Sequence, residues 1–383
     1  MHVVVLGIGM IGATVVKELV HYSGISKITA VDGVKENVDS CIKAVGHSKV
    51  SGKYTNLQTE DDIFEEIKDA DVAVACLPHS LSLPAIHASI AARCNIVDLV
   101  GSKYEEKIKL DSKAKKAGII VVPGCGVAPG LSNFLAAQGI DMLDDAEEAV
   151  MVCGGIPRYP VPPLWYQIVF RLESVMGLYT RPALAAENGK LVHLPPLSGL
   201  EKMTFPNPVG ECELVVTDAH STAYTLKDKV NKIYEKTARY AGHWTKMSTL
   251  AELGFLEQKK IEIEGLQISP RKFTEKILEP KLVGKSKEDI TVLRVTTRGK
   301  RKGQNTTHTW EMIDFYDHER EITSMAKTTA IPAMLLAHWI LNGKVTETGV
   351  VPIENIIRDE RFHSFMSELK IKGIEISYSE QVE

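Results

Sequence analysis

A glycine-rich turn near the N-terminus, Gly7-x-Gly9-x-x-Gly12, constrains the fold more than any other feature of the sequence. A short apolar run over residues 2–6 precedes the turn, and an apolar-periodic segment over residues 11–20 follows it. A strand, a glycine turn and a helix in this order predict the first half of a dinucleotide-binding βαβ unit. The alternative is a glycine-rich turn in an α/β protein that binds no ligand.

Each glycine has its own expected role in such a unit. Gly7 permits the tight turn out of the strand, Gly9 leaves the backbone open to a pyrophosphate, and Gly12 lets helix and strand approach closely. The helix then begins at Met10 and Ile11, where unpaired N–H groups and a partial positive charge favour phosphate. These five residues are therefore candidate cofactor-binding residues.

An acidic residue closes the predicted unit. A second apolar run, residues 28–31, ends at Asp32, twenty residues after Gly12. A carboxylate at this distance accepts hydrogen bonds from the hydroxyls of an adenosine ribose and repels a 2′-phosphate. Residues 33–35 contain no arginine, so the sequence predicts NAD rather than NADP as the cofactor.

Short apolar runs continue to alternate with helical segments up to about residue 128. This alternation predicts strands at 53–56, 72–77, 96–100 and 119–122 and helices at 61–70, 84–93 and 111–117. The pattern indicates a doubly wound parallel sheet that is buried on both faces. Residues 1–128 are therefore predicted to form the NAD-binding domain.

Ligands of such sheets bind beyond the carboxyl ends of the strands. The residues at these ends are therefore the next candidates for cofactor contacts, namely Leu77, Pro78, Val100 and Val127. Asp98 ends a predicted strand at the same edge.

The pattern changes after a glycine- and proline-rich break at residues 124–130. A helix is predicted near 131–143, and longer strands that look antiparallel are predicted at 232–240, 259–263, 290–297 and 306–316. The basic segment 298–303 is predicted to be a solvated hairpin tip, since no aromatic residues interleave with its charges. Residues 129–320 are thus predicted to form an α+β domain with a mostly antiparallel sheet.

Two segments have a less regular pattern. Residues 154–208 are rich in proline and aromatic residues, which is typical of lids and interface arms. A helix rich in small residues is predicted at 324–341, and it either packs on the first domain or caps the second. Residues 321–383 are accordingly expected to form a C-terminal segment that returns to the first domain.

Composition narrows the class of protein. The net charge of −4 argues against a nucleic-acid partner, and the most apolar helical stretch, 329–341, is too short to span a membrane. The six cysteines show neither a CxxC pair nor metal-ligand spacing, so we expect no metal site and reduced thiols in the cytoplasm. The first strand begins at residue 2, so we expect no targeting peptide.

The sequence resembles the saccharopine dehydrogenase superfamily, and within it the L-lysine 6-dehydrogenases, along nearly its whole length. The matching segments are VLGIGMIG (5–12), VDL (97–99), GVAPG (126–130), GGIP (154–157), PPLWYQIVF (162–170), LYTRPAL (178–184), RYAGH (239–243), TSMAKTTA (323–330) and VTETGV (345–350). The resemblance implies a Rossmann domain, a substrate-binding and dimerisation domain, and a homodimer. It also implies NAD-linked oxidation of the ε-amine of lysine to 2-aminoadipate 6-semialdehyde and ammonia.

This chemistry needs a proton acceptor, because a carbon that bears an ammonium group cannot release a hydride. A lysine ε-amine has a pKa of about 10.4, so most of it must lose a proton at neutral pH. Asp98 is the first candidate for the base, and a helix-cap acceptor is its alternative role. His243 titrates in the useful range, and a core histidine is its alternative role.

The substrate must also be held. Arg239 is the best candidate to bind an α-carboxylate, because it lies in a motif shared with the family. Tyr166 and Glu173 are candidates to hold the amino group; a packed aromatic and a solvated acid are the alternatives. Cys125 lacks a partnered histidine in its motif and is interpreted as a small filler.

Two other functions remain open. A saccharopine-type dehydrogenase, which joins or splits a C–N bond between two amino acids, must hold three carboxylates and needs more than one arginine. Arg171 and Arg181 would supply them if both line the cleft. A non-catalytic NAD-binding regulator would retain the fold but have no ionisable group near the nicotinamide.

Overall fold

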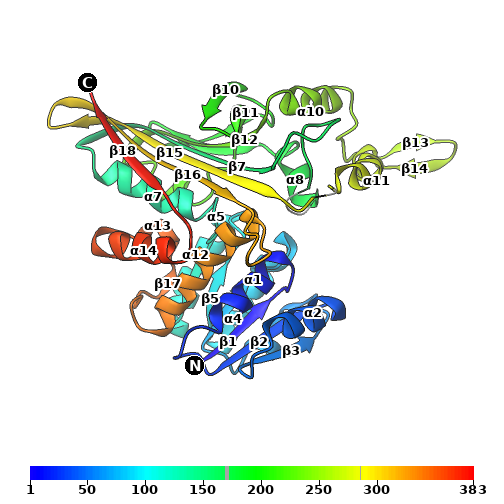
Figure 1. The fold of residues 1–383 in the computed structure, drawn as a ribbon, viewed down its shortest axis with the longest axis vertical. Coiled ribbons are helices and arrows are strands. Elements are labelled where there is room, and N and C mark those ends of the chain that lie inside the picture. Colours follow the sequence, from blue (N-terminus) through cyan, green and yellow to red (C-terminus); the bar gives the residue numbers. More distant parts are fainter. Residues whose placement is uncertain (169–171, 285) are drawn as a thin grey trace. The chain divides into compact units, whose positions relative to one another are not determined.

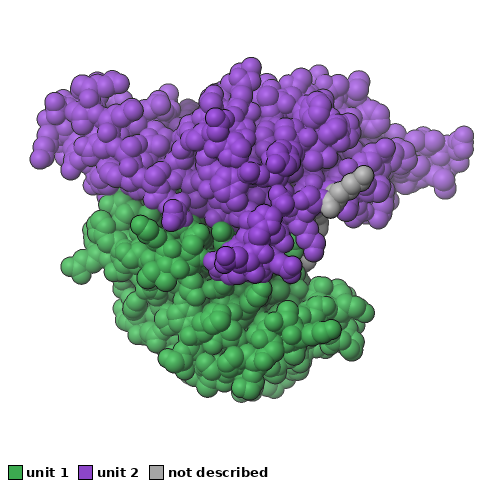
Figure 2. Space-filling view, viewed as in Figure 1, with its two compact units in different colours: residues 1–138, 326–374 green, residues 139–325, 375–383 purple. Residues whose placement is uncertain are grey.

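The computed structural model describes residues 1–168, 172–284 and 286–383, with the backbone alone at 172–174. The chain forms two compact units, each made of two segments (Figure 2). The first unit comprises Met1–Gln138 and Ala326–Ile374, and the second comprises Gly139–Met325 and Glu375–Glu383.

The first unit is built on a seven-stranded parallel sheet of order β17-β6-β5-β4-β1-β2-β3 (Figure 1). Its strands are β1 (His2–Leu6), β2 (Lys27–Asp32), β3 (Val50–Tyr54), β4 (Val72–Ala75), β5 (Asn95–Asp98), β6 (Ile120–Pro123) and β17 (Gly349–Val350). Between them lie α1 (Met10–Leu19), α2 (Lys35–Val45), α3 (Glu60–Ile67), the 3₁₀ helix η1 (His79–Leu81), α4 (Ser82–Ala92), α5 (Tyr104–Ile108) and α6 (Asp111–Ala117). This arrangement confirms the predicted doubly wound parallel sheet.

Burial explains where the predicted boundaries hold. The four residues of β4 are fully buried, as are Val3–Leu6 of β1, so each valine or leucine side chain among them contributes about 1.5–3 kcal/mol. Strand β3 lies at the sheet edge and is mostly exposed, and it spans Val50–Tyr54 rather than the predicted 53–56. Helix α2 buries only Val38 and Cys41, so its apolar pattern is too sparse to predict the helix.

The second unit is built on a nine-stranded sheet whose main path runs β10-β11-β12-β7-β15-β16-β18, with β8 pairing β12 and β9. Its strands are β7 (Asp145–Pro157), β8 (Ala183–Glu187), β9 (Lys190–Leu194), β10 (Glu201–Phe205), β11 (Gly210–Thr217), β12 (Val230–Tyr240), β15 (Asp289–Arg301), β16 (Gln304–Phe315) and β18 (Ser377–Val382). All pairs in this sheet are antiparallel except β12 with β7. The mostly antiparallel sheet is thus confirmed.

Helices and a small hairpin accompany this sheet. They are α8 (Leu172–Leu178), α9 (Thr222–Thr225), α10 (His243–Glu252), α11 (Pro270–Leu282) and the hairpin of β13 (Ile261–Ile263) and β14 (Leu266–Ile268). Two expectations need correction. The basic segment 298–303 mostly belongs to β15, since its strands pair as far as Arg301 with Gln304. The stretch 154–208 contains α8 and β8–β10 and is more regular than expected.

Two helices connect the units in sequence. Helix α7 spans Leu131–Asp141, and α12 spans Ser324–Leu341 as predicted, with residues from Ala326 onward in the first unit. Helices α13 (Ile353–Ile356) and α14 (Asp359–Ile371) follow in that unit. The chain then returns to the second unit, where β18 pairs with β16.

A buried carboxylate begins helix α12. Asp289 accepts the backbone N–H groups of Ser324 (2.6 Å) and Met325 (2.9 Å), two of the donors that a helix N-terminus leaves unsatisfied. Burial nevertheless dominates and raises the pKa of Asp289 to about 6 from an ordinary 3.8. The folded chain therefore holds a proton at Asp289 over a pH range in which the unfolded chain has already lost it.

We expect Asp289 to make unfolding depend on pH. As pH rises from about 4 to about 6, its contribution to the free energy of unfolding falls by about 3 kcal/mol. Asn at position 289 removes this titration, so the Asp289→Asn variant should gain stability relative to the wild type over that range. Urea unfolding midpoints at pH 4 to 7 measure the difference; a constant offset between the two proteins would contradict the prediction.

Candidate functional site

The glycine turn after β1 has the geometry that its spacing predicts. Gly7 has a φ of +87°, and a Cβ there would lie 2.5 Å from the carbonyl oxygen of Cys76. A Cβ at Gly12 would lie 1.9 Å from the carbonyl oxygen of Gly7. A Cβ at Gly9 would meet no heavy atom within 4 Å. Packing therefore requires glycine at positions 7 and 12. At position 9 the backbone faces open space, which a pyrophosphate needs in order to approach it.

Helix α1 begins without a side-chain cap of its own. Its N-cap residue, Gly9, makes no side-chain capping hydrogen bond, and no acidic residue lies in the first turn at Met10 and Ile11. The uncompensated N–H groups and helix dipole favour a phosphate at this position.

Asp32 lies beside this turn at the end of β2. Its carboxylate accepts the backbone N–H groups of Ile8 (2.5 Å) and Val34 (2.7 Å). Lys35 pairs with Asp39 at 2.5 Å in solvent, and the chain has no arginine before Arg93. The acid is thus fixed next to the open glycine turn, with no guanidinium nearby in sequence to accept a 2′-phosphate.

The other candidate cofactor residues lie at the carboxyl ends of neighbouring parallel strands. Leu77 and Pro78 follow β4, and a Cβ at Gly7 would lie 3.5 Å from a methyl group of Leu77. Val100 follows β5, and Val127 follows β6, where it forms an isolated bridge with Gly130. The structure therefore places all four at the carboxyl edge of this parallel sheet, the edge at which doubly wound sheets generally bind ligands.

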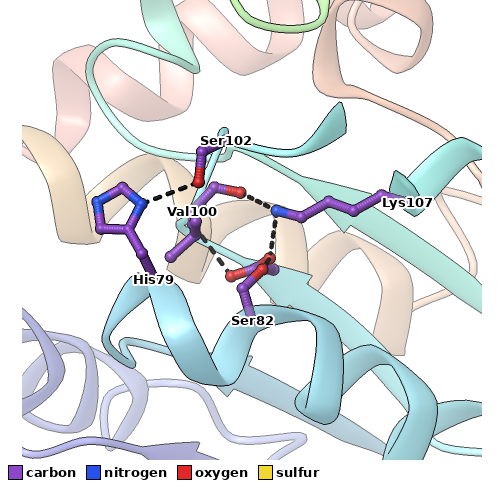
Figure 3. A network of polar contacts seen from close by, with 6 residues as sticks. His79, Ser82, Val100, Ser102 and Lys107 are labelled. Atoms are coloured by element: carbon purple, nitrogen blue, oxygen red, sulfur yellow. Dashed lines mark hydrogen bonds and ion pairs between the residues drawn. The ribbon is translucent and has the colours of Figure 1, made fainter. Parts of the chain in front are cut away.

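Asp98 is fully buried in a polar network (Figure 3). Its carboxylate accepts from Lys107 Nζ (2.9 Å), Ser82 Oγ (2.6 Å) and the Val100 N–H (3.0 Å). The Lys107 ammonium, also fully buried, donates in addition to the Val100 carbonyl. These contacts hold the loop after β5 against α4 and α5. They favour the acceptor role for Asp98 over that of a general base.

Three polar side chains at this edge were not singled out from the sequence, namely Ser82, Ser102 and Lys107. Beside the Asp98 network, His79 lies within hydrogen-bond distance of Ser102, 2.9 Å from Nδ1 to Oγ (Figure 3). Lys107 lies in the five-residue helix α5, and its burial follows from its partner Asp98 rather than from an apolar pattern. A lone lysine in a charged helix gives no sequence signal for such a role.

Arg239 is buried on one face of the second unit's sheet. It is 4% exposed, and its guanidinium carbon lies 4.8 Å from the Tyr166 ring centroid and 5.7 Å from that of Trp244. Nη1 donates to the carbonyl of Ala238 at 2.8 Å, whereas Nε has no hydrogen-bond partner among the described residues. A buried guanidinium with an unsatisfied donor, held between aromatic rings, suits a substrate carboxylate.

His243, the first residue of α10, is fully buried beside this group. Its Nδ1 lies 2.8 Å from the Leu164 carbonyl, which can only accept, so Nδ1 carries the proton and Nε2 accepts from the Tyr179 hydroxyl at 3.0 Å. Burial, followed by the charge of Arg239, lowers the pKa of His243 to about 3. A histidine that stays neutral in this way is a weak base, which favours the core-histidine alternative.

The remaining substrate candidates are only partly placed. Tyr166 is buried and packs on Arg239 and His243. Glu173 lies in α8, and its side chain is outside the described residues, as is Arg171. Arg181 is exposed, with its guanidinium packed on Gly177 of α8. Burial raises the pKa of the Cys125 thiol, which agrees with its interpretation as a filler.

Within residues 1–168, 172–284 and 286–383, no group of three or more His, Cys, Asp or Glu side chains is placed to hold a metal ion. None of the helices found in these ranges combines the length and the apolar character that crossing a membrane requires.

The glycine geometry leads to a paired prediction. Gly9→Val should fold normally, because its side chain enters open space, but should weaken binding of NADH by about tenfold or more. Gly12→Ala should lower the melting temperature by several degrees, because its Cβ clashes with backbone. Thermal unfolding and fluorescence titration with NADH measure both. Equal NADH affinity in Gly9→Val and wild type would contradict the placement of the pyrophosphate.

Both parts of the sequence match family models. Residues 3–122 match the Saccharopine dehydrogenase NADP binding domain, and residues 126–374 match the Saccharopine dehydrogenase C-terminal domain. The fold is similar to that of apo saccharopine dehydrogenase (L-Glu forming) from Saccharomyces cerevisiae, with a TM-score of 0.79, 19% identity and 99% of each chain covered.

Curated relatives agree with these models at low identity. The saccharopine dehydrogenase [NADP(+), L-glutamate-forming] of Pyricularia oryzae is 22% identical over 92% of this chain and 93% of its own length. The carboxyaminopropylagmatine dehydrogenase of Synechocystis is 21% identical, with 93% of each covered. The alpha-aminoadipic semialdehyde synthase of Arabidopsis thaliana is 25% identical over 57% of this chain, which spans only 22% of that protein. The chain therefore belongs to the saccharopine dehydrogenase family of oxidoreductases, with a nicotinamide-dinucleotide-binding domain at its N-terminal end.

Proposed function

We propose that this protein catalyses NAD-dependent oxidative deamination of the ε-amino group of L-lysine, giving 2-aminoadipate 6-semialdehyde and ammonia. The observation that carries the proposal is the single buried guanidinium of Arg239, which has an unsatisfied Nε among the described residues. It suits a substrate with one carboxylate, and lysine has one.

The choice of NAD rests on Asp32. The matching family model is described as an NADP binding domain, and three fungal relatives are named for NADP. In this chain, however, Asp32 lies beside the glycine turn and no arginine precedes Arg93. A carboxylate there repels a 2′-phosphate, which supports NAD.

The remaining steps follow from what the reaction requires. When bound, the dinucleotide accepts a hydride from the carbon that carries the amine. The glycine turn and the α1 N-terminus bind its pyrophosphate, and Asp32 binds its adenosine ribose. Arg239, flanked by Tyr166 and Trp244, binds the substrate carboxylate in a site with little water.

This proposal predicts a pH dependence. Burial and the charge of Arg239 lower the pKa of His243 to about 3, and Lys107 holds the Asp98 carboxylate in a buried ion pair. Neither side chain is therefore arranged to accept a proton from the substrate. The supply of neutral amine then limits the reaction, and kcat/KM for lysine should rise about tenfold per pH unit between about pH 7 and 9. A plateau below pH 8 in the pH profile would contradict this and indicate a base with a pKa near 7.

The alternative is a saccharopine-type dehydrogenase acting on a secondary amine between two amino-acid parts. It is favoured by the saccharopine dehydrogenase of Pyricularia oryzae, which aligns over more than nine-tenths of both chains. Against it, Arg239 is the only buried arginine among the described residues, and Arg181 is exposed.

One assay tests both readings. Absorbance at 340 nm is followed with NAD or NADP and, separately, L-lysine, saccharopine and L-ornithine. The proposal expects the largest kcat/KM with L-lysine and NAD. A larger value with saccharopine supports the alternative, and tight NAD binding with no turnover of any substrate supports a non-catalytic regulator.

A further inference from the structure

An acidic side chain lies directly opposite Arg239. In the antiparallel pair of β11 and β12, Glu213 is in register with Arg239. Residues directly opposite each other in such a pair point to the same face, with Cβ atoms about 5 Å apart. Glu213 is 9% exposed and Arg239 is 4% exposed, so a buried anion and a buried cation are neighbours.

These two charges do not neutralise each other directly. Oε2 of Glu213 and Nε of Arg239 both lack hydrogen-bond partners within the described ranges, and no ion pair joins the two side chains there. Buried charges are normally paired, since an unpaired one loses its hydration without compensation. A carboxylate and a guanidinium this close, each with an atom that lacks a hydrogen-bond partner among the described residues, suit a ligand that carries one positive and one negative charge.

Helix α10 holds both residues in place. The Trp244 indole N–H donates to the backbone carbonyl of Glu213 at 3.0 Å, and its ring lies 5.7 Å from the guanidinium carbon of Arg239. Trp244 is fully buried. One aromatic side chain thus covers both strands at this point and keeps bulk water from the two charges.

We propose that Glu213 and Arg239 form a subsite for the zwitterionic head of a free α-amino acid. The guanidinium binds the α-carboxylate, and the Glu213 carboxylate binds the α-ammonium. The chemical class of ligand is therefore an α-amino acid rather than a simple amine or a monocarboxylate.

If lysine is the substrate, as the proposed function states, the subsite also explains why the ε-amine reacts and the α-amine does not. An α-amine bound to Glu213 stays protonated, so it has no lone pair to form a C=N bond and the Cα hydrogen stays. The unprotonated ε-nitrogen supplies its lone pair to form a C=N bond with C6 as C6 loses one hydrogen as a hydride, which a bound dinucleotide would accept. Water then adds to the resulting C=N bond, and ammonia leaves as the aldehyde forms.

Two non-reactive probes test the subsite in the full-length protein. L-Norleucine and hexanoate have the same carbon chain, and only norleucine carries an α-ammonium. Titration calorimetry, with NADH present and absent, should show the wild type binding norleucine at least about tenfold more tightly than hexanoate. Glu213→Gln should lose this preference. Glu211→Gln is the matched control on the same strand, exposed and paired with Lys202, and should keep it.

A second measurement needs no variant. 6-Aminohexanoate is lysine without its α-amino group, and the wild type should bind it at least about tenfold more weakly than L-lysine. Equal affinity for these two compounds, or an unchanged norleucine preference in a folded Glu213→Gln protein, would overturn the proposal. If the protein binds norleucine more tightly than hexanoate but forms no NADH from lysine, the subsite is retained and lysine is rejected as the substrate.

Discussion

Replacing Arg239 by lysine is expected to lower kcat/KM for the amino-acid substrate by about 100-fold to 1,000-fold. Such a loss is on the order of 3–4 kcal/mol, in the range for a buried, charged hydrogen-bonded pair. Lysine keeps the positive charge but cannot present two parallel N–H donors to a carboxylate or stack on Tyr166 as the guanidinium does. Most of the loss should appear as a higher KM, because the carboxylate is held in both the bound substrate and the transition state.

Arg181→Lys is the matched control for this experiment. Arg181 is exposed and packs on Gly177 of α8, so its replacement should change kcat/KM by less than about threefold. If Arg181→Lys and Arg239→Lys lower kcat/KM equally, two guanidinium groups hold the substrate and the saccharopine-type alternative gains support. Unchanged kinetics in Arg239→Lys would reject Arg239 as the carboxylate-binding residue.

Replacing Lys107 by methionine is expected to lower the free energy of unfolding of the first unit by about 3–5 kcal/mol. The substitution leaves the Asp98 carboxylate fully buried without its cation. Lys109→Met is the control, because Lys109 pairs with Glu105 at 3.6 Å in solvent and should contribute less than about 1 kcal/mol. Denaturant unfolding measures both, and a loss below 1 kcal/mol in Lys107→Met would contradict the expectation.

The double variant Asp98→Asn/Lys107→Met separates stability from catalysis at the same position. Asparagine still accepts from the Val100 N–H at Oδ1, and its Nδ2, in the place of Oδ2, can donate to the Ser82 hydroxyl oxygen, so most of the lost stability should return. A stable double variant that retains activity assigns Asp98 to holding the loop. A stable but inactive one assigns it the role of base that the sequence first suggested.

The nucleotide half of the fold could be predicted because its determinants are local. Strand β1 and helices α6 and α12 have the predicted boundaries. Strand β1 ends before Gly7, α6 lies between Asp111 and Gly118, and the apolar pattern of α12 begins after Ser324 and ends before Asn342. The glycine spacing predicts the open turn because the requirement falls on the backbone itself. Strand β3 was misplaced and β8–β10 were not predicted, because short or exposed edge strands carry little apolar signal.

The substrate half depends on pairing between distant segments, which one sequence does not reveal. Arg239 was singled out only through a motif shared with the family, whereas Glu213 and Lys107 were not identified. A buried charge looks the same in sequence as a solvated one until its neighbour across the sheet or in the next loop is known. The roles of Asp98 and His243, the use of NAD and the homodimer stay predictions.

Transfer of deuterium from labelled lysine shows whether the protein oxidises C6, the carbon that carries the ε-amine, and passes its hydride to the dinucleotide. L-Lysine with two deuterium atoms at C6, and separately L-lysine with one at C2, are incubated with the protein and NAD, and the reduced dinucleotide is analysed by mass spectrometry. If the ε-amine is oxidised, we expect one deuterium per reduced dinucleotide from the C6-labelled substrate and none from the C2-labelled one. Deuterium from C2, or unlabelled reduced dinucleotide from C6-labelled lysine, would contradict it.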